Sequence, residues 1–163
     1  YENPRELGSD RIANAVAAEK LYGAPSIVVD FGTATNIDVV DSDGYYIGGA
    51  IAPGLRISMD ALVARAARIA SIPLETPPHA IGRTTEEAVQ SGAVLGTAAM
   101  VEGLVSRIQA ELGAPEARVI ATGGLASIVA DSTNVFDVVD GQLTLKGICE
   151  IARRMRDRVP RTA

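Results

Sequence analysis

Two glycine-containing turns, each directly after an apolar segment, are the places where this sequence could bind phosphate groups. The first is Asp30-Phe31-Gly32-Thr33-Ala34-Thr35, and the second is Thr122-Gly123-Gly124. Glycine lets the backbone approach a ligand, while hydroxyl and free N–H groups can bind phosphate oxygens and Asp30 can hold a cation. The second turn precedes a predicted helix, whose N-terminal amides favour anions. Each turn alone also fits a structural role, as a capped hairpin or as close strand–helix packing.

A third polar segment, Gly8-Ser9-Asp10-Arg11, stands at the start of a predicted helix. An aspartate at this place is most often a helix cap. Because Arg11 follows it directly, the alternative is a carboxylate base beside a fixed cation.

Hydrophobic periodicity and turn residues predict the elements that would position these groups. We expect strands over 26–30, 36–40, 45–51, 118–122 and 135–139, and helices over 10–22, 53–68, 84–112, from 124 to about 130 and 143–158. The Asp41-Ser42-Asp43-Gly44 segment is a hairpin turn signal, so the first three strands form an antiparallel meander. Strands that then alternate with helices predict an α/β fold, a mixed sheet with helices on its faces.

The composition is that of a folded soluble protein: 163 residues, of which 47% are hydrophobic and 21% charged. The net charge of −5 argues against a surface that coats nucleic acid. The lone Cys149 excludes an intrachain disulfide, and with the single His79 it offers too few ligands for zinc. We expect Cys149 in the core and His79 in a surface loop. The uncharged segment 88–101 is too short to span a membrane, and no signal peptide is recognised, so we expect a cytoplasmic protein.

Six strings, in order along the chain, give a specific resemblance. They occupy residues 3–11, 28–35, 48–54, 81–85 with 90–92, 121–126 and 143–147. On these strings the chain resembles the second half or more of a type III pantothenate kinase, a member of the acetate and sugar kinase/heat-shock 70/actin superfamily. The resemblance implies the ribonuclease-H-like domain of that superfamily, with the order βββαβαβα. It also implies transfer of the γ-phosphoryl group of ATP to the 4′-hydroxyl of pantothenate, the first step of coenzyme A synthesis.

The resemblance assigns residues to the pantothenate site. Asp10 would be the base that accepts the hydroxyl proton. The substrate contacts would be Tyr1, Gly8, Ser9, Asp10, Arg11 and Thr85. Thr85 would reach pantothenate from the partner subunit of a homodimer, and Gly92 and Gly96 would allow close helix packing, including across such an interface. Arg83 and Thr84 replace the Lys-Asn common in the family, which leaves Thr84 as an alternative to Thr85; Ser9 replaces the usual alanine.

The resemblance likewise implies a nucleotide site. Thr33, with Gly32, Gly123 and Gly124, would contact ATP, which the family binds with Mg²⁺. Asp30 would hold a monovalent cation, K⁺ or NH₄⁺. The family begins with an Asp-x-Gly-Asn-Thr phosphate loop, which does not occur among these 163 residues. We therefore expect the isolated chain to have no kinase activity.

The expected organisation is a helical connector over 1–25, a ribonuclease-H-like domain over 26–158 and a tail over 159–163, without the family's N-terminal ATP-binding half. Two other functions were weighed: a non-catalytic ligand-binding or regulatory relative, and an actin-like or sugar-kinase relative. The presence of Asp10, Arg11, Asp30 and Thr33 favours catalysis. The 8–11 segment and the Thr85 region argue against the last alternative.

Overall fold

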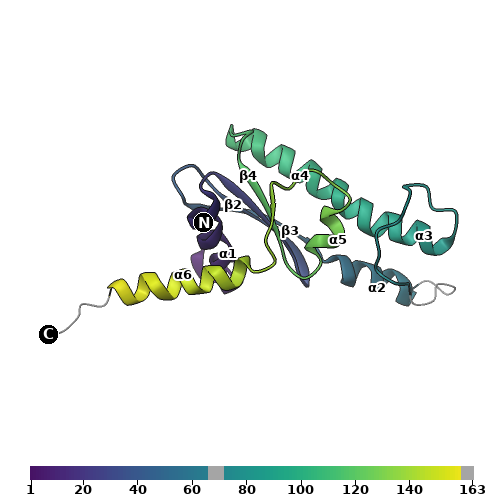
Figure 1. The fold of residues 1–163 in the computed structure, drawn as a ribbon, viewed down its shortest axis with the longest axis horizontal. Helices are drawn as coiled ribbons and strands as arrows, with labels where there is room; N and C mark the ends of the chain where they lie inside the picture. Colours follow the sequence, from purple (N-terminus) through teal and green to yellow (C-terminus); the bar gives the residue numbers. More distant parts are fainter. Residues whose placement is uncertain (66–71, 159–163) are drawn as a thin grey trace.

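The computed structural model describes residues 1–65 and 72–158, and the fold is built on one five-stranded sheet (Figure 1). The strands are β1 (Ser26–Phe31), β2 (Ala34–Val40), β3 (Tyr46–Pro53), β4 (Arg118–Thr122) and β5 (Val138–Val139). The helices are α1 (Ser9–Tyr22), α2 (Leu55–Arg65), α3 (Thr85–Gln90), α4 (Gly96–Leu112), α5 (Ala126–Ala130) and α6 (Leu143–Arg158). A short 3-10 helix η1 (Pro4–Glu6) precedes α1, and a π-helical segment η2 (Ser91–Leu95) joins α3 to α4.

The strand order in the sheet is β3-β2-β1-β4-β5. β1, β2 and β3 pair antiparallel as the predicted meander, whereas β4 pairs parallel with both β1 and β5. The hairpin turn forms as expected, since the Asp41 carboxylate accepts hydrogen bonds from the backbone N–H groups of Asp43 (3.0 Å) and Tyr45 (2.9 Å). This order, with helices on both faces, confirms the ribonuclease-H-like mixed sheet expected from the sequence.

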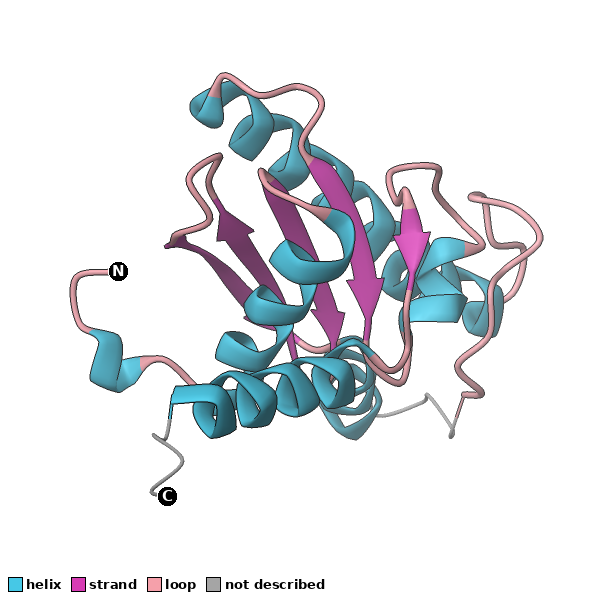
Figure 2. Cartoon of the chain, turned by 60° about the vertical axis from the view of Figure 1, so that its left-hand side comes forward, coloured by secondary structure: helices cyan, strands magenta, loops and turns pink. Residues whose placement is uncertain are grey.

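The two faces of the sheet carry different helices (Figures 1 and 2). Alternate residues of β1 point to opposite faces. Ile27, Val29 and Phe31 join a large apolar cluster with residues of α2, α4 and α5. Val28 lies in a smaller cluster with Ala17 and Ala18 of α1 and Leu143 of α6. The second face therefore belongs to α1 and α6, and α1 carries the Asp10 segment.

Helices α1 and α6 cross at very short range. A Cβ atom on Gly147 would overlap the backbone carbonyl of Ala13, so only glycine permits this approach. At the start of α6, Asp140 Oδ2 accepts hydrogen bonds from Tyr22 Oη and Lys146 Nζ, both at 2.7 Å. The donors from Tyr22 and Lys146 lower the pKa of Asp140, although burial by itself raises it.

Several sequence predictions need correction. The strand over 135–139 is only Val138–Val139, because Val135 and Phe136 instead pack against the large apolar cluster. Cys149 is exposed on α6, so its assignment to the core is wrong, whereas His79 is exposed as expected. The predicted end of the helix at residue 68 lies outside the described residues.

The continuous helix from Thr85 to Leu112 has the length and apolar composition of a membrane span, judged on the described residues. Its uncharged part, residues 88–101, is only 14 residues long. In the structure this helix packs Val94, Ala98, Val101 and Val105 into the apolar cluster against the sheet. A core helix of a folded domain can have the same composition.

Candidate functional site

The two glycine turns predicted to bind phosphate lie side by side. They follow neighbouring parallel strands, with Asp30 of β1 in register with Thr122 of β4. The N–H of Leu125 donates to the carbonyl of Phe31 at 3.4 Å, which joins the turns directly. Gly123 has φ +93°, and a Cβ atom there would come within 2.5 Å of Asp30 Oδ1. The structure thus brings the two sequence segments together at the carboxyl end of the parallel strands, where open α/β sheets bind ligands.

The first turn is tight and accessible. Gly32 and Thr33 alone connect β1 to β2, and the N–H of Gly32 donates to the carbonyl of Ala34 at 3.0 Å. Gly54 supports this turn from behind, since a Cβ atom at Gly54 would overlap the carbonyl oxygens of Gly32 and Thr33. Gly32, Thr33 and, in the second turn, Gly124 are exposed, so their polar groups can reach a ligand.

Asp30 is half-buried between the turns and α1. Its Oδ2 accepts a hydrogen bond of 2.9 Å from Asn14 Nδ2. Burial raises the pKa of Asp30, the Asn14 hydrogen bond lowers it, and the negative charge of Asp10 raises it again. Asp10 stands four residues before Asn14 on α1, and residues at this spacing share a helix face. The structure therefore brings the exposed Asp10 to the same side of α1 as the residue that contacts Asp30.

Arg11 is buried beside a strand residue that the sequence analysis missed. Its Nε donates to Asp38 Oδ1 at 2.7 Å, and Tyr46 Oη donates to the same oxygen at 2.8 Å. Burial by itself lowers the pKa of Arg11, but the charge and the hydrogen bond of Asp38, together with Tyr46 and Tyr1, outweigh it, so the pKa is raised. Burial raises the pKa of Asp38, against the Tyr46 and Arg11 hydrogen bonds. A charged residue between the apolar residues Ile37 and Val39 was the available signal for Asp38.

Tyr46 also connects Arg11 with Tyr1. The Arg11 guanidinium carbon lies 5.6 Å from the centre of the Tyr46 ring, within range of a cation–π interaction. The rings of Tyr1 and Tyr46 meet edge to face, with centres 5.4 Å apart. Asp38 Oδ2 is buried and has no hydrogen-bond partner in the described part of the chain. Five of the six predicted substrate residues are thus gathered around the start of α1 and β3: Tyr1, Gly8, Ser9, Asp10 and Arg11.

Thr85 lies elsewhere. Figure 1 places α3 at the end of the molecule far from α1, so Thr85 is not brought to Asp10 within one chain. The structure also separates the roles of the two adjacent threonines. Thr84 Oγ1 accepts from the N–H of Glu87 at 3.1 Å and caps α3. Thr85 is the first residue of α3, and both threonines are exposed.

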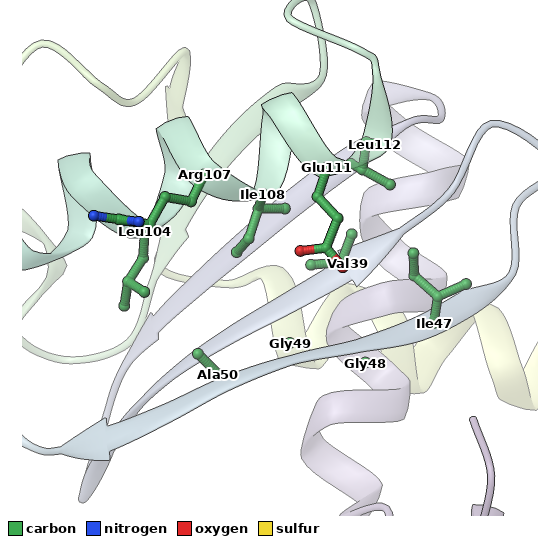
Figure 3. Close-up of a pocket in the computed structure, with 10 residues that line it drawn as sticks. All are labelled: Val39, Ile47, Gly48, Gly49, Ala50, Leu104, Arg107, Ile108, Glu111 and Leu112. Atoms are coloured by element: carbon green, nitrogen blue, oxygen red, sulfur yellow. The ribbon is translucent and has the colours of Figure 1, made fainter.

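A groove lies on the α4 face of the sheet, the face opposite to α1. It has a volume of about 330 Å³ and runs between α4 and the strands β2 and β3 (Figure 3). Its lining residues are Val39, Ile47, Gly48, Gly49, Ala50, Leu104, Arg107, Ile108, Glu111 and Leu112. None of them is a predicted site residue. The groove is mainly apolar and shows no convergence of polar groups, so we place the functional site at the two turns and α1.

Asp30 is the acidic side chain at the corner between the two turns and is the group there that could hold a cation. Among residues 1–65 and 72–158, no three His, Cys, Asp or Glu side chains cluster closely enough to hold a metal. The negative charge of Asp10 also acts on Asp30.

Solved structures with similar folds define the class of protein. A Baf family transcriptional activator from Campylobacter jejuni aligns with a TM-score of 0.67 and 21% identity, over 94% of this chain and 67% of that one. The activator of 2-hydroxyisocaproyl-CoA dehydratase from Clostridium difficile, solved with bound ADPNP, aligns with a TM-score of 0.52 and 13% identity, over 94% and 70%. The fold is that of the actin-like ATPases.

Sequence comparison gives the family. The model of the type III pantothenate kinase family matches residues 1–107. The type III pantothenate kinase of Thermomicrobium roseum is 56% identical over 94% of this chain and 59% of its own length. That of Moorella thermoacetica is 51% identical over 91% of this chain and 58% of its own. The chain belongs to the type III pantothenate kinase family, and it spans a little under three fifths of these curated relatives.

Proposed function

We propose that the protein containing this chain transfers the γ-phosphoryl group of ATP to the 4′-hydroxyl of pantothenate, the first step of coenzyme A biosynthesis. One observation carries the proposal: the Asp30–Thr33 turn and the Gly123–Gly124 turn are adjacent, and Asp10 stands on the face of α1 that contacts Asp30. Phosphoryl transfer depends on alignment and charge neutralisation more than on covalent chemistry, and an edge of this kind can supply both.

Asp10 acts as the base in this proposal. Its carboxylate is exposed at the first turn of α1, so it can meet a hydroxyl group that approaches from solvent. It orients the 4′-hydroxyl and accepts its proton as the phosphoryl group is transferred. A Cβ atom on Gly8 would come within 2.5 Å of Asp10 Oδ1, so a side chain at position 8 would require the Asp10 carboxylate to turn.

Arg11 and Tyr1 bind the rest of pantothenate, together with Gly8 and Ser9. Since Asp38 holds Nε of Arg11, the terminal guanidinium nitrogens are the groups available to a carboxylate. A guanidinium and a carboxylate form paired hydrogen bonds of good geometry. The edge-to-face contact of Tyr1 with Tyr46 provides an aromatic wall beside this position.

The two turns bind the nucleotide. Thr33 and the backbone of Gly32, Gly123 and Gly124 contact the phosphates of ATP, which enters as its Mg²⁺ complex. Asp30 holds K⁺ or NH₄⁺, and such a cation offsets phosphate charge when bound. The residues of this chain supply one wall of the nucleotide cleft, so the isolated 163-residue chain is expected to be inactive.

A homodimer accounts for the position of Thr85. Because Thr85 lies far from Asp10 in one chain, it contacts pantothenate bound to the partner subunit. Gly92 and Gly96 follow on the same helix; both are exposed, with open space where a Cβ atom would stand. Small residues at this spacing allow a second helix to approach closely. We place the enzyme in the cytoplasm, with no nucleic-acid partner, in keeping with its net charge of −5.

The test is a coupled ADP-release assay with pantothenate on the intact protein and its Asp10→Asn variant. We expect the variant to lose about 10²–10⁴-fold in kcat, the usual contribution of a general base. Asp60→Asn on α2 is the matched control, an exposed helical carboxylate away from the site. Unchanged turnover in Asp10→Asn would remove Asp10 from the base role. Absence of pantothenate phosphorylation by the intact protein would overturn the function.

A further inference from the structure

Asn14 is a fully buried residue of α1 whose side-chain amide lies between β1 and α6. None of the roles above uses it. Its Nδ2 donates to Asp30 Oδ2 at 2.9 Å, and its Oδ1 accepts from Thr144 Oγ1 at 2.7 Å. Asn14 and Thr144 are 130 residues apart in the sequence, and Asp30 lies 16 residues after Asn14. They form a continuous hydrogen-bonded row that runs from α6 through α1 to the carboxylate at the end of β1.

The orientation of the Asn14 amide is fixed by its partners. A carboxylate only accepts hydrogen bonds, so the NH₂ group must face Asp30 and the carbonyl must face Thr144. Turning the amide over would set its oxygen against the Asp30 carboxylate. Since Asn14 is 0% exposed, water cannot replace either partner.

This arrangement makes the two oxygens of Asp30 different. Oδ2 is held by Asn14, whereas Oδ1 is directed at the two glycine turns. A Cβ atom on Gly123 would lie 2.5 Å from Oδ1, and one on Gly32 would lie 3.7 Å from it. Rotation of the carboxylate would break the Asn14 hydrogen bond, so the bond keeps one oxygen at the corner where the turns meet.

A purely structural role does not require an asparagine at this place. The neighbouring interface between α1, α6 and the sheet is filled by Ala17, Ala18, Val28, Ile120 and Leu143, all apolar. A buried amide with satisfied partners adds little net stability over an apolar side chain of similar shape. The amide does, however, give Asp30 a defined orientation.

We propose that Asn14, supported by Thr144, is a positioning residue that orients the Asp30 carboxylate for the monovalent cation beside the ATP phosphates. The inference rests on the proposed function, because it takes Asp30 as the cation-binding residue. It adds that α6 takes part in the nucleotide site through Thr144, without touching a ligand.

The test compares Asn14→Leu and Thr144→Val in the intact protein, both close to the native shape. The control is Thr97→Val on α4, which removes a similar half-buried hydroxyl whose partner is the Ala93 carbonyl. Two properties are measured: the rise in thermal midpoint caused by KCl relative to tetramethylammonium chloride at equal ionic strength, and the half-saturating K⁺ concentration for kinase activity with the KM for pantothenate.

We expect Asn14→Leu to raise the half-saturating K⁺ concentration by about tenfold, the effect of losing one hydrogen bond to a charged group. Its KCl-induced thermal shift should decrease accordingly, while the KM for pantothenate changes less than about twofold. Thr144→Val should show the same pattern at about threefold, because the Asn14 bond remains but is less well held. Thr97→Val should match the wild type.

Equal changes in the K⁺ and pantothenate constants would reduce Asn14 to a structural residue and overturn the inference. A wild-type thermal shift retained in both variants would do the same. If Asn14→Leu fails to fold, Thr144→Val alone decides, and a wild-type K⁺ response in it overturns the inference. A wild-type protein that does not phosphorylate pantothenate would instead overturn the proposed function, so the two failures are distinct.

Discussion

The two faces of the sheet are packed in different ways, although the residues concerned are neighbours on the same strands. On the α4 face, β1 contributes Ile27, Val29 and Phe31, which are buried among apolar side chains only. On the α1 face, the same sheet contributes Asp30 and Asp38, whose partners are polar residues of α1 and β3. The change from one kind of packing to the other takes place between adjacent residues.

The difference shows where stability and chemistry are located. Burial of apolar surface stabilises a fold by roughly 25 cal/mol per Å², so the α4 face provides most of the stability. A buried ion pair such as Arg11–Asp38 gains little over apolar packing, since removing both charges from water offsets their attraction. Stability alone therefore does not explain the buried Arg11–Asp38 pair, and the proposed ligand site would account for it.

The largest expected effect comes from breaking the ion pair on one side. Asp38→Leu leaves the Arg11 charge buried without a partner and should cost about 3–5 kcal/mol in the free energy of unfolding. The double variant Arg11→Met with Asp38→Leu should recover most of this loss, yet it should not bind pantothenate. Urea unfolding and the pantothenate KM of the intact protein measure the two properties. A double variant as unstable as the single one would show that the pair serves the fold.

A cavity on the α4 face should lower stability and leave activity unchanged, the reverse of what we expect of the double variant. Ile27→Ala removes a fully buried side chain and should cost about 2–5 kcal/mol in the free energy of unfolding. At temperatures where the variant is folded, its kcat and KM for pantothenate should equal those of the wild type. Thermal unfolding and steady-state kinetics check this together. A selective change in KM would mean that the two faces are not independent.

The smallest effect concerns Asp140, a polar contact on the α1 face that lies outside the ligand site. At pH 7, Asp140→Asn should cost about 1.5–3 kcal/mol, because charged hydrogen bonds to Tyr22 and Lys146 are lost. The pKa of Asp140 is lowered from 3.8, so this contribution is present above pH 3.8 and is lost as the pH falls through the lowered value.

Urea unfolding from pH 7 down to pH 2 should therefore show the wild type and Asp140→Asn becoming equally stable at the acid end. Asp131→Asn, an exposed carboxylate at the end of α5, is the control and should show no difference at any pH. A gap between wild type and Asp140→Asn that stays constant with pH would mean that the loss is due to packing rather than to charge.

The sequence predicted what local patterns determine. The strands of the meander, the Asp41 turn and the two glycine turns follow from β-branched runs and from glycine, and the structure agrees to within two residues for the meander strands. The β4 end predicted at Thr122 is also observed. These features depend on neighbours along the chain, which a sequence displays.

The missed residues depend on contacts between distant segments. Asn14, Asp38 and Tyr46 gain their roles from α1 lying across the sheet, which no local pattern encodes. Cys149 was placed in the core by residue type, but α6 packs on α1 with its other face. The roles assigned to the site residues in binding pantothenate, ATP and a cation all stay predictions, as they need a ligand and, for Thr85, a partner subunit.

The contact between Gly147 and Ala13 has a mechanical consequence. With no side chain between the two backbones, α1 and α6 cannot slide or tilt independently without overlap. Helix α1, which carries Asp10, and helix α6 must therefore move together as one rigid unit. Any displacement of the outer end of α6 is passed on to the first turn of α1, where Asp10 lies.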